Sequence, residues 1–225
     1  VTARGPFKRW TKGDDNSPVS DGDIAVNNLL RARLMQLAPD AGWLSEETED
    51  PGGTTPLNWI VDPIDGTRAY ISGRADWTIS VALVENGRPL LAALFAPMTD
   101  EMFLGAIDAG ATLNGRAMRA SERGTLEGAR MIGQRARFAD NKWAKPWPKM
   151  DIEQRESIAY RMALVAAGHG DATILFGFKH YWDIAAGAAI VEAAGGAVTD
   201  IWGKPLAFDL HEPRAPSVVA SGAAL

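Results

Sequence analysis

The sequence contains no cysteine among its 225 residues. Disulfide bonds, a catalytic thiolate and a cysteine-ligated zinc site are therefore excluded for this chain. No run reaches the ~18 consecutive apolar residues of a membrane-spanning helix. The first residues, Val1 to Pro6, have no apolar stretch typical of a secretory signal. We therefore expect a cytoplasmic protein with no membrane partner. Because the chain starts at Val1 rather than Met, we also expect a longer natural protein.

An excess of positive charge is also missing. The chain has 23 Lys and Arg against 28 Asp and Glu, which gives a net charge of -5 and an isoelectric point near 5.3. Proteins that bind polyanions through bulk electrostatics have the opposite balance. We therefore expect no nucleic acid polymer as a partner, whereas a small anionic metabolite requires only a local site.

Hydrophobic residues make up 46% of the chain, enough for a substantial core. Their spacing predicts both helices and strands, and Asn86-Gly87 is a strong hairpin signal between two apolar runs. The sequence thus predicts an α/β or α+β protein. The expected helices are Asp23 to Leu37, Glu156 to Ala167 and Trp182 to Ala194, and the expected strands are Leu57 to Val61, Trp77 to Glu85, Pro89 to Ala96 and Ala172 to Phe176.

Residues 121–148 show no regular period, because Arg, Trp and Pro interrupt it. We place a domain boundary there. The expected units are an amino-terminal α+β half at residues 1–120 and a carboxy-terminal α/β half at residues 121–225.

The most informative motif is Asp62-Pro63-Ile64-Asp65-Gly66-Thr67, which follows the apolar run Trp59 to Val61. The proline restricts its own φ and the glycine allows close backbone approach, so two carboxylates and the Ile64 carbonyl could converge on one side of a turn. Hard oxygen ligands of this kind suit Mg²⁺. If a helix starts at Thr67, the amides of Gly66 and Thr67 would form a phosphate site beside the metal.

Other acidic residues end apolar segments in the same way. Glu46 and Glu47 follow Trp43-Leu44, and Asp183 follows Tyr181-Trp182 at the start of an apolar helix. Each has an ordinary alternative, because Asp is common in turns and helix caps and Glu in solvated loops. Their recurrence in one chain favours a shared cation site.

Together these motifs resemble the inositol monophosphatase family in content and order. The resemblance implies an α-β-α-β-α sandwich with the metal site between its two halves, and a Mg²⁺-dependent phosphomonoesterase. It also implies two or three Mg²⁺ ions per site, sensitivity to lithium and a homodimer. The matching segments are Trp43 to Thr48, Val61 to Thr67, Gly110 to Gly115, Trp182 to Gly187 and Glu192 to Gly196, with Lys12, Ser17-Pro18-Val19 and Asp23 near the amino terminus.

The resemblance also implies roles for single residues. Attack by an activated water needs no covalent phosphoenzyme. Thr67 and Asp23 would orient this water, Glu47 would be a further ligand or a base, and the amides of Gly66 and Thr67 would hold the phosphate. The expected metal ligands are Glu46, Asp62, the Ile64 carbonyl, Asp65 and Asp183, the last of which would also face the substrate.

Two further positions bear on the substrate. Inositol-specific members have an acidic residue seven positions before the aspartate that Asp183 matches, whereas this chain has Phe176, which suits a flat ring better. Arg161 lies where bisphosphate nucleotidases have a lysine for a second phosphate, although it could instead pair with Glu156 at the surface. We therefore place a 3'(2'),5'-bisphosphate nucleotidase first. The alternatives are an inositol-1-monophosphatase, a histidinol-phosphate phosphatase, which the stretch from Asp62 to Gly73 resembles, and a non-catalytic metal-binding relative.

Overall fold

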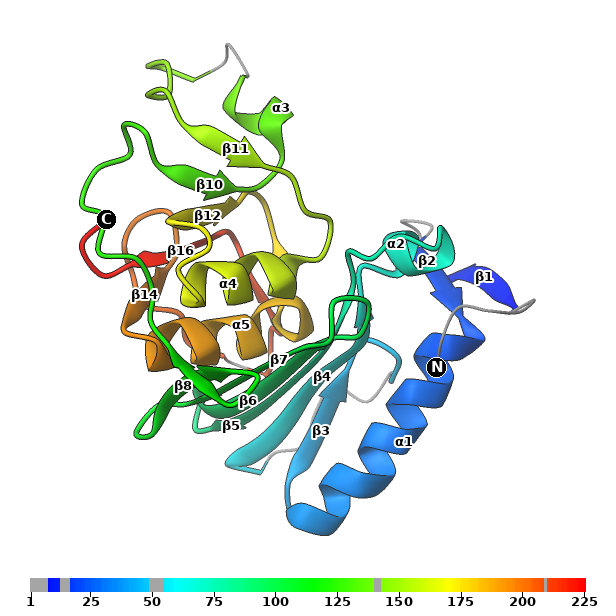
Figure 1. Ribbon diagram of the computed structural model, residues 1–225. Helices are drawn as coiled ribbons and strands as arrows, with labels where there is room; N and C mark the ends of the chain where they lie inside the picture. Colours follow the sequence, from blue (N-terminus) through cyan, green and yellow to red (C-terminus); the bar gives the residue numbers. More distant parts are fainter. Residues whose placement is uncertain (1–7, 13–16, 49–54, 140–142, 209) are drawn as a thin grey trace.

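Two sheets form the framework of the molecule (Figure 1). The structure is a computed structural model that describes residues 8–12, 17–48, 55–139, 143–208 and 210–225, so the prediction made for Val1 to Pro6 lies outside the described residues. The larger sheet has seven strands, in the order β3 (Gly42–Ser45), β4 (Leu57–Asp65), β5 (Thr78–Glu85), β6 (Arg88–Ala96), β7 (Glu101–Ala106), β8 (Gly110–Leu113) and β9 (Arg116–Met118). The smaller sheet has five, in the order β11 (Asp151–Glu153), β10 (Arg130–Ile132), β12 (Ala172–Leu175), β16 (Val218–Gly222) and β14 (Gly196–Thr199). Two short pairs are β1 (Arg9–Lys12) with β2 (Ser17–Ser20), and β13 (Lys179–His180) with β15 (Arg214–Ala215).

The helices form layers around these sheets. The outer face of the larger sheet is covered at β3 and β4 by α1 (Asp21–Leu37), and α4 (Ile158–Ala166) and α5 (Tyr181–Ala193) lie between the two sheets (Figure 1). The short α3 (Arg135–Phe138) packs on the far face of the smaller sheet. A fifth helix, α2 (Thr67–Ile71), follows β4. This α-β-α-β-α order confirms the predicted fold class. Among the described residues, no helix is long and apolar enough to cross a membrane.

Small residues let α5 pack closely on both sides. A Cβ added to Gly187 would lie 2.7 Å from the Cβ of Met162 on α4, and one added to Gly105 of β7 would lie 2.8 Å from the Cα of Ile190. Larger side chains at these positions would force the layers apart. Close packing therefore places the first turn of α5 near the strands of the larger sheet.

Most of the predicted elements are confirmed. The hairpin between β5 and β6 has φ values of 49° at Asn86 and 78° at Gly87, as a type I′ turn requires. Several boundaries differ by one or two residues, such as the start of α1 at Asp21 rather than Asp23, and the end of β4 differs by four. β4 continues past Val61 to Asp65, and α4 begins two residues after Glu156 because the side chain of Ser157 caps it.

One hydrophobic core continues from the larger sheet through α4 and α5 to the smaller sheet. The division at residue 120 stays a proposal, and it rests on the separation of the two sheets along the chain. β9, an edge strand of the larger sheet, ends at Met118, and β10 of the smaller sheet begins at Arg130. The stretch predicted to be irregular, residues 121–148, contains β10 and α3.

Candidate active site

An irregularity in β4 brings two carboxylates to one side of the strand. Asp62 pairs with Ser80 of β5 and Asp65 with Thr78, so three residue steps on β4 match two on β5. In a regular strand, side chains three positions apart point to opposite faces, whereas a bulge of one residue reverses this relation. Pro63 lies within the irregular stretch, where a missing N–H is tolerated. The motif that predicted a turn therefore forms a bulge.

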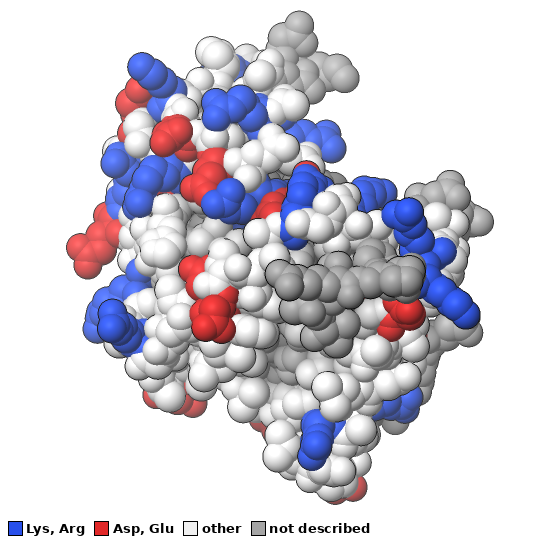
Figure 2. Space-filling view, turned by 45° about the vertical axis from the view of Figure 1, so that its right-hand side comes forward, with Lys and Arg blue, Asp and Glu red and all other residues white. Residues whose placement is uncertain are grey.

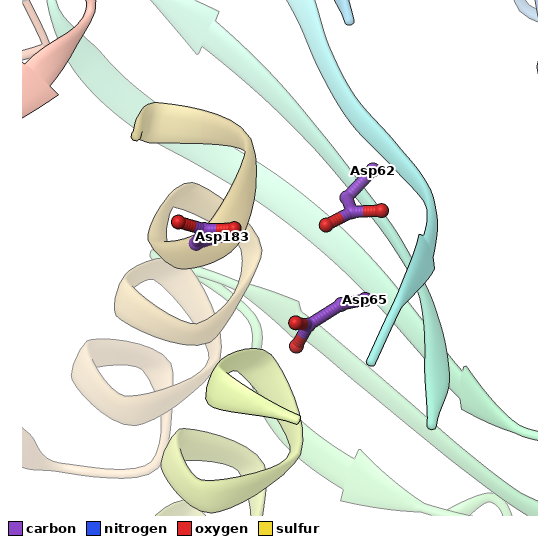
Figure 3. A group of neighbouring side chains, drawn as sticks. All are labelled: Asp62, Asp65 and Asp183. Carbon is purple, nitrogen blue, oxygen red and sulfur yellow. The ribbon is translucent and has the colours of Figure 1, made fainter. Parts of the chain in front are cut away.

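A third carboxylate comes from a distant part of the sequence. Asp183 lies in the first turn of α5, and its Oδ2 accepts a hydrogen bond of 3.2 Å from the His180 amide. Ligand oxygen atoms of Asp62, Asp65 and Asp183 all lie within 4.8 Å of one another. Figure 3 shows the three side chains gathered between the end of β4 and the start of α5. The packing of α5 on the larger sheet thus assembles the cluster.

The three carboxylates line a pocket of about 180 Å³. Most of the predicted site residues also line it, whereas Pro18, Arg68 and Glu156 were not among the predicted site residues. The complete lining is Pro18, Glu46, Asp62, Ile64, Asp65, Gly66, Thr67, Arg68, Glu156 and Asp183.

The start of α4 holds Asp65 in place. The Ser157 hydroxyl and the Ala159 amide both donate to Asp65 Oδ2, each at 2.6 Å. Ser157 is fully buried and also caps α4. Sequence reasoning missed this contact, because a helix-cap residue can be recognised locally but the distant carboxylate that it meets cannot.

Lys12 joins the two glutamates that follow β3. Its Nζ lies 3.3 Å from Glu46 Oε1 and 2.6 Å from Glu47 Oε1, and it also donates to the Glu46 carbonyl oxygen at 2.9 Å. Burial lowers the pKa of Lys12, but the two carboxylates outweigh this effect and raise it. Glu46 lines the pocket, whereas Glu47 is not among the lining residues.

Asp23 and Thr67, the pair expected to orient water, are in contact. Thr67 Oγ1 lies 3.3 Å from Asp23 Oδ1 and 3.0 Å from the Ile64 carbonyl oxygen, and its single proton can serve one of them at a time. The other oxygen of Asp23 accepts bonds from the Ser20 amide (2.8 Å) and hydroxyl (2.5 Å), and the bond from the amide is part of the capping box of α1. One carboxylate therefore caps a helix and contacts Thr67.

Gly66 occupies a position that requires glycine. Its φ is 96°, and an added Cβ would lie 2.9 Å from the Asp76 carbonyl oxygen. The helix α2 starts at Thr67, as predicted, so the amides of Gly66 and Thr67 lie at its positive end. Both residues line the pocket beside the carboxylates.

Arg161 and Phe176 are the two predicted substrate contacts that the structure places outside the lining of the pocket. Arg161 is buried, with 6% of its surface exposed. Its guanidinium donates to the carbonyl oxygens of Arg155 (2.7 Å) and Glu156 (3.1 Å). The alternative of a surface pair with the Glu156 carboxylate is therefore wrong. The ring of Phe176 packs against Trp143, with centroids 5.1 Å apart.

Burial and mutual repulsion act against the charged forms of the central carboxylates. Burial, and then the charges of Glu46, Asp65 and Asp183, raise the pKa of Asp62 well above its ordinary value. The pKa of Asp183 is raised similarly, by burial and then by Asp65 and Glu46. A divalent cation would remove this repulsion, and carboxylate oxygens are the ligands that Mg²⁺ prefers. The residues present therefore fit such a cation.

Glu46 gives the metal-free protein a predictable pH dependence. Burial raises its pKa from 4.5 to about 7, against the opposing charge of Lys12. Between these pH values the native protein retains a proton that the unfolded chain has released. The free energy of unfolding should therefore fall by about 1–3 kcal/mol as pH rises through this window.

Thermal unfolding from pH 4.5 to pH 7, with and without a chelator, tests this expectation. Mg²⁺ should displace the proton and make Tm less dependent on pH, and Glu46→Gln should flatten the curve of the chelated protein. Equal slopes for the chelated, Mg²⁺-loaded and Glu46→Gln proteins would contradict the assignment.

One face of the molecule has mixed charge (Figure 2). On the face shown in Figure 2, Lys and Arg side chains alternate with Asp and Glu side chains in the upper part, and the lower part is largely uncharged. The described residues on that face therefore form no continuous positive surface of the kind that a nucleic acid backbone favours.

Clustered carboxylates in the bulge of β4 and the first turn of α5 fit a site for a divalent cation. The chain belongs to the inositol monophosphatase family, whose sequence model matches residues 3–223. It is therefore a phosphoric monoester hydrolase of a metal-dependent family. The predicted family and reaction class are confirmed.

The relatives of this chain carry different names. The Nus factor SuhB of Xylella fastidiosa is 36% identical over 192 residues, which cover 82% of this chain and 69% of the relative. The 3'(2'),5'-bisphosphate nucleotidase CysQ of Escherichia coli K12 is 32% identical over 211 residues (88% and 82%), and the inositol-1-monophosphatase of Rhizobium meliloti is 34% identical over 203 residues (84% and 74%). Among solved structures, an IMPase of Thermotoga maritima has a TM-score of 0.84 at 28% identity and covers 99% of this chain and 85% of that one. The similarity shows the family without selecting a substrate.

Proposed function

We propose that this chain is a Mg²⁺-dependent phosphomonoesterase whose substrate is a 3'(2'),5'-bisphosphate nucleotide. The observation that carries the proposal is the cluster of Asp62, Asp65 and Asp183, with ligand oxygens within 4.8 Å of one another; Asp62 and Asp65 are buried and Asp183 is half-buried. A phosphate monoester carries nearly two negative charges at neutral pH, so these carboxylates would repel it without cations between them. The cluster thus favours a divalent cation and an anionic substrate together.

The cation would be held by carboxylates from three elements and by one carbonyl. When bound, Mg²⁺ lowers the pKa of water and screens the phosphate oxygens. The proposed ligands are Glu46, Asp62, the Ile64 carbonyl, Asp65 and Asp183.

Residues beside the cluster would position the water and the phosphate. When Thr67 donates its proton to Asp23 Oδ1, the lone pairs of its hydroxyl are left to accept a hydrogen bond from the attacking water. The amides of Gly66 and Thr67 would donate to the phosphate. Glu47 stays a candidate for orienting water, with its Oε1 bound to Lys12.

Arg68 supports a substrate with a second anionic group. It is the only Lys or Arg among the residues that line the pocket, and it is exposed. Within the described part of the chain, no side chain forms an ion pair or hydrogen bond with its guanidinium. A guanidinium binds phosphate through two parallel hydrogen bonds, so a second phosphate at the mouth of the pocket would complete its contacts.

Arg68→Gln should raise KM for 3'-phosphoadenosine 5'-phosphate ~10-fold and leave KM for a monophosphate nearly unchanged. Steady-state kinetics at two salt concentrations would measure this, with the larger effect at low salt. The matched control is Arg116→Gln, an exposed arginine on β9 at the far edge of the larger sheet. Equal effects of Arg68→Gln on both substrates would count against the bisphosphate.

The experiment that tests the function itself is phosphate release, with Mg²⁺ present or chelated, from a panel of substrates. The panel comprises 3'-phosphoadenosine 5'-phosphate, inositol 1-phosphate, histidinol phosphate and fructose 1,6-bisphosphate. We expect Mg²⁺-dependent release with preference for the first. Absence of release from every member, in a folded protein that binds Mg²⁺, would contradict the proposal.

A second candidate is an inositol-1-monophosphatase, which the Rhizobium meliloti relative favours. Preference for inositol 1-phosphate in the same panel would select it, and preference for histidinol phosphate would select the third candidate. Two or three Mg²⁺ ions, lithium sensitivity, a homodimer and a cytoplasmic location stay predictions from the family resemblance.

A further inference from the structure

The hydrogen bonds of Ser157 are fully accounted for, and they converge on Asp65. A serine hydroxyl has one proton to donate and two lone pairs. Ser157 Oγ accepts a bond of 3.0 Å from the Tyr160 amide and lies 3.1 Å from Thr78 Oγ1. Because the carboxylate of Asp65 can only accept when it is ionised, the Ser157 proton goes to Asp65 Oδ2 at 2.6 Å and Thr78 supplies its own proton to Ser157.

This arrangement selects which oxygen of Asp65 faces the cluster. Oδ2 receives both the Ser157 hydroxyl and the Ala159 amide, so Oδ1 is the oxygen that α4 leaves to a cation. A carboxylate on a bulged strand would otherwise rotate freely about its terminal bond. The start of α4 therefore determines how the Asp65 carboxylate is oriented and which of its oxygens can bind a cation.

The segment that carries Ser157 is itself held from two sides. Arg161, one turn into α4, donates to the carbonyl oxygens of Arg155 and Glu156. The Glu156 amide donates to Asp76 Oδ2 from the opposite direction. Arg161 is buried and Asp76 is half-buried, and removal from water makes the bonds of a charged side chain to the backbone stronger than at the surface.

We propose that Ser157 is a positioning residue that orients Asp65 for cation binding, and that Arg161 and Asp76 hold the segment from which it acts. The inference rests on the proposed function, because it takes Asp65 as a cation ligand. Residues that hydrogen-bond to metal ligands typically change metal affinity or activity by about 10- to 100-fold when they are replaced. The rival role for Ser157 is helix capping alone, which would affect folding but not the cation.

The test compares Ser157→Ala, Ser157→Thr and Ser157→Val with the natural chain. Threonine keeps the hydroxyl, and valine matches threonine in shape without it, so this pair isolates the hydroxyl even if the alanine variant does not fold. Calorimetric titration with Mg²⁺ should give a dissociation constant about 10- to 100-fold weaker for alanine and valine. Threonine should restore tight binding.

The unfolding temperature in the presence of a chelator measures how much the Ser157 cap of α4 contributes to stability. A lower unfolding temperature with an unchanged dissociation constant for Mg²⁺ in Ser157→Val would overturn the inference and leave only a capping role. If the natural chain binds Mg²⁺ but releases no phosphate from the substrate panel, the proposed function fails while the titration still tests Ser157. If the natural chain binds no Mg²⁺, both fail.

Discussion

Asp62→Asn is expected to lower kcat/KM for Mg²⁺-dependent phosphate release by ~10³-fold while the protein stays folded. Asparagine has nearly the same shape, and its carbonyl oxygen can still accept the hydrogen bond of 3.0 Å from the Ile64 amide. What is lost is one negative charge in the centre of the cluster. Phosphate release as a function of Mg²⁺ concentration measures the effect.

The same substitution should not destabilise the metal-free protein. The charge of Asp62 is opposed by burial and then by Glu46, Asp65 and Asp183, so its removal relieves repulsion. We expect Tm in chelator to equal or exceed that of the natural chain, and the rise in Tm on adding Mg²⁺ to shrink. A retained Mg²⁺ response with unchanged turnover would remove Asp62 from the metal site.

Asp171 offers a matched control, because it is a buried aspartate in the opposite environment. Burial raises its pKa, but hydrogen bonds from Ser121 and Arg130 outweigh burial and lower it. Its carboxylate also lies 3.2 Å from Arg123. Asp171→Asn should therefore reduce stability and leave the Mg²⁺ dependence of phosphate release unchanged. The two aspartates thus separate catalysis from stability.

Arg161→Ala is expected to lower the free energy of unfolding by about 3 kcal/mol, because two partly buried carbonyl oxygens lose charged donors. The negative charges of Asp65 and Asp76 also lose their nearest buried cation. Urea unfolding followed by circular dichroism would measure the loss. Arg161→Lys keeps the charge but not the two-pronged geometry, so it should recover only part of it.

The kinetic effect of Arg161→Ala should be equal for bisphosphate and monophosphate substrates. Arg161 acts on Asp65 through the segment before α4, and every substrate depends on Asp65. A selective loss of bisphosphate turnover at unchanged stability would instead support direct contact with a second phosphate, as the sequence had suggested. Comparison of Arg161→Ala with Arg68→Gln would then show which arginine contacts the second phosphate.

Features decided by short-range chemistry could be predicted from the sequence. The Asn86-Gly87 turn depends on residues that are neighbours in the chain, and it is found where expected. The acidic motif from Asp62 to Thr67 also indicated a cation and phosphate site. Carboxylates close together after an apolar strand repel each other unless a cation lies between them, and the glycine allows close approach of the backbone to a ligand. The recurrence of acidic residues after apolar segments extended this prediction to Glu46 and Asp183, and the family resemblance implied the same ligands.

The tertiary structure decided how these groups meet. The bulge that turns Asp62 and Asp65 to one side depends on pairing with β5, and the Ser157 contact joins positions 92 residues apart. Arg161 was predicted as a substrate contact because it lies where bisphosphate nucleotidases have a lysine, but α4 lies between two sheets and turns it inward. Local sequence determines which elements form and which groups they offer. Which groups come within bonding distance depends on how the layers pack, because that packing joins residues that no local pattern relates.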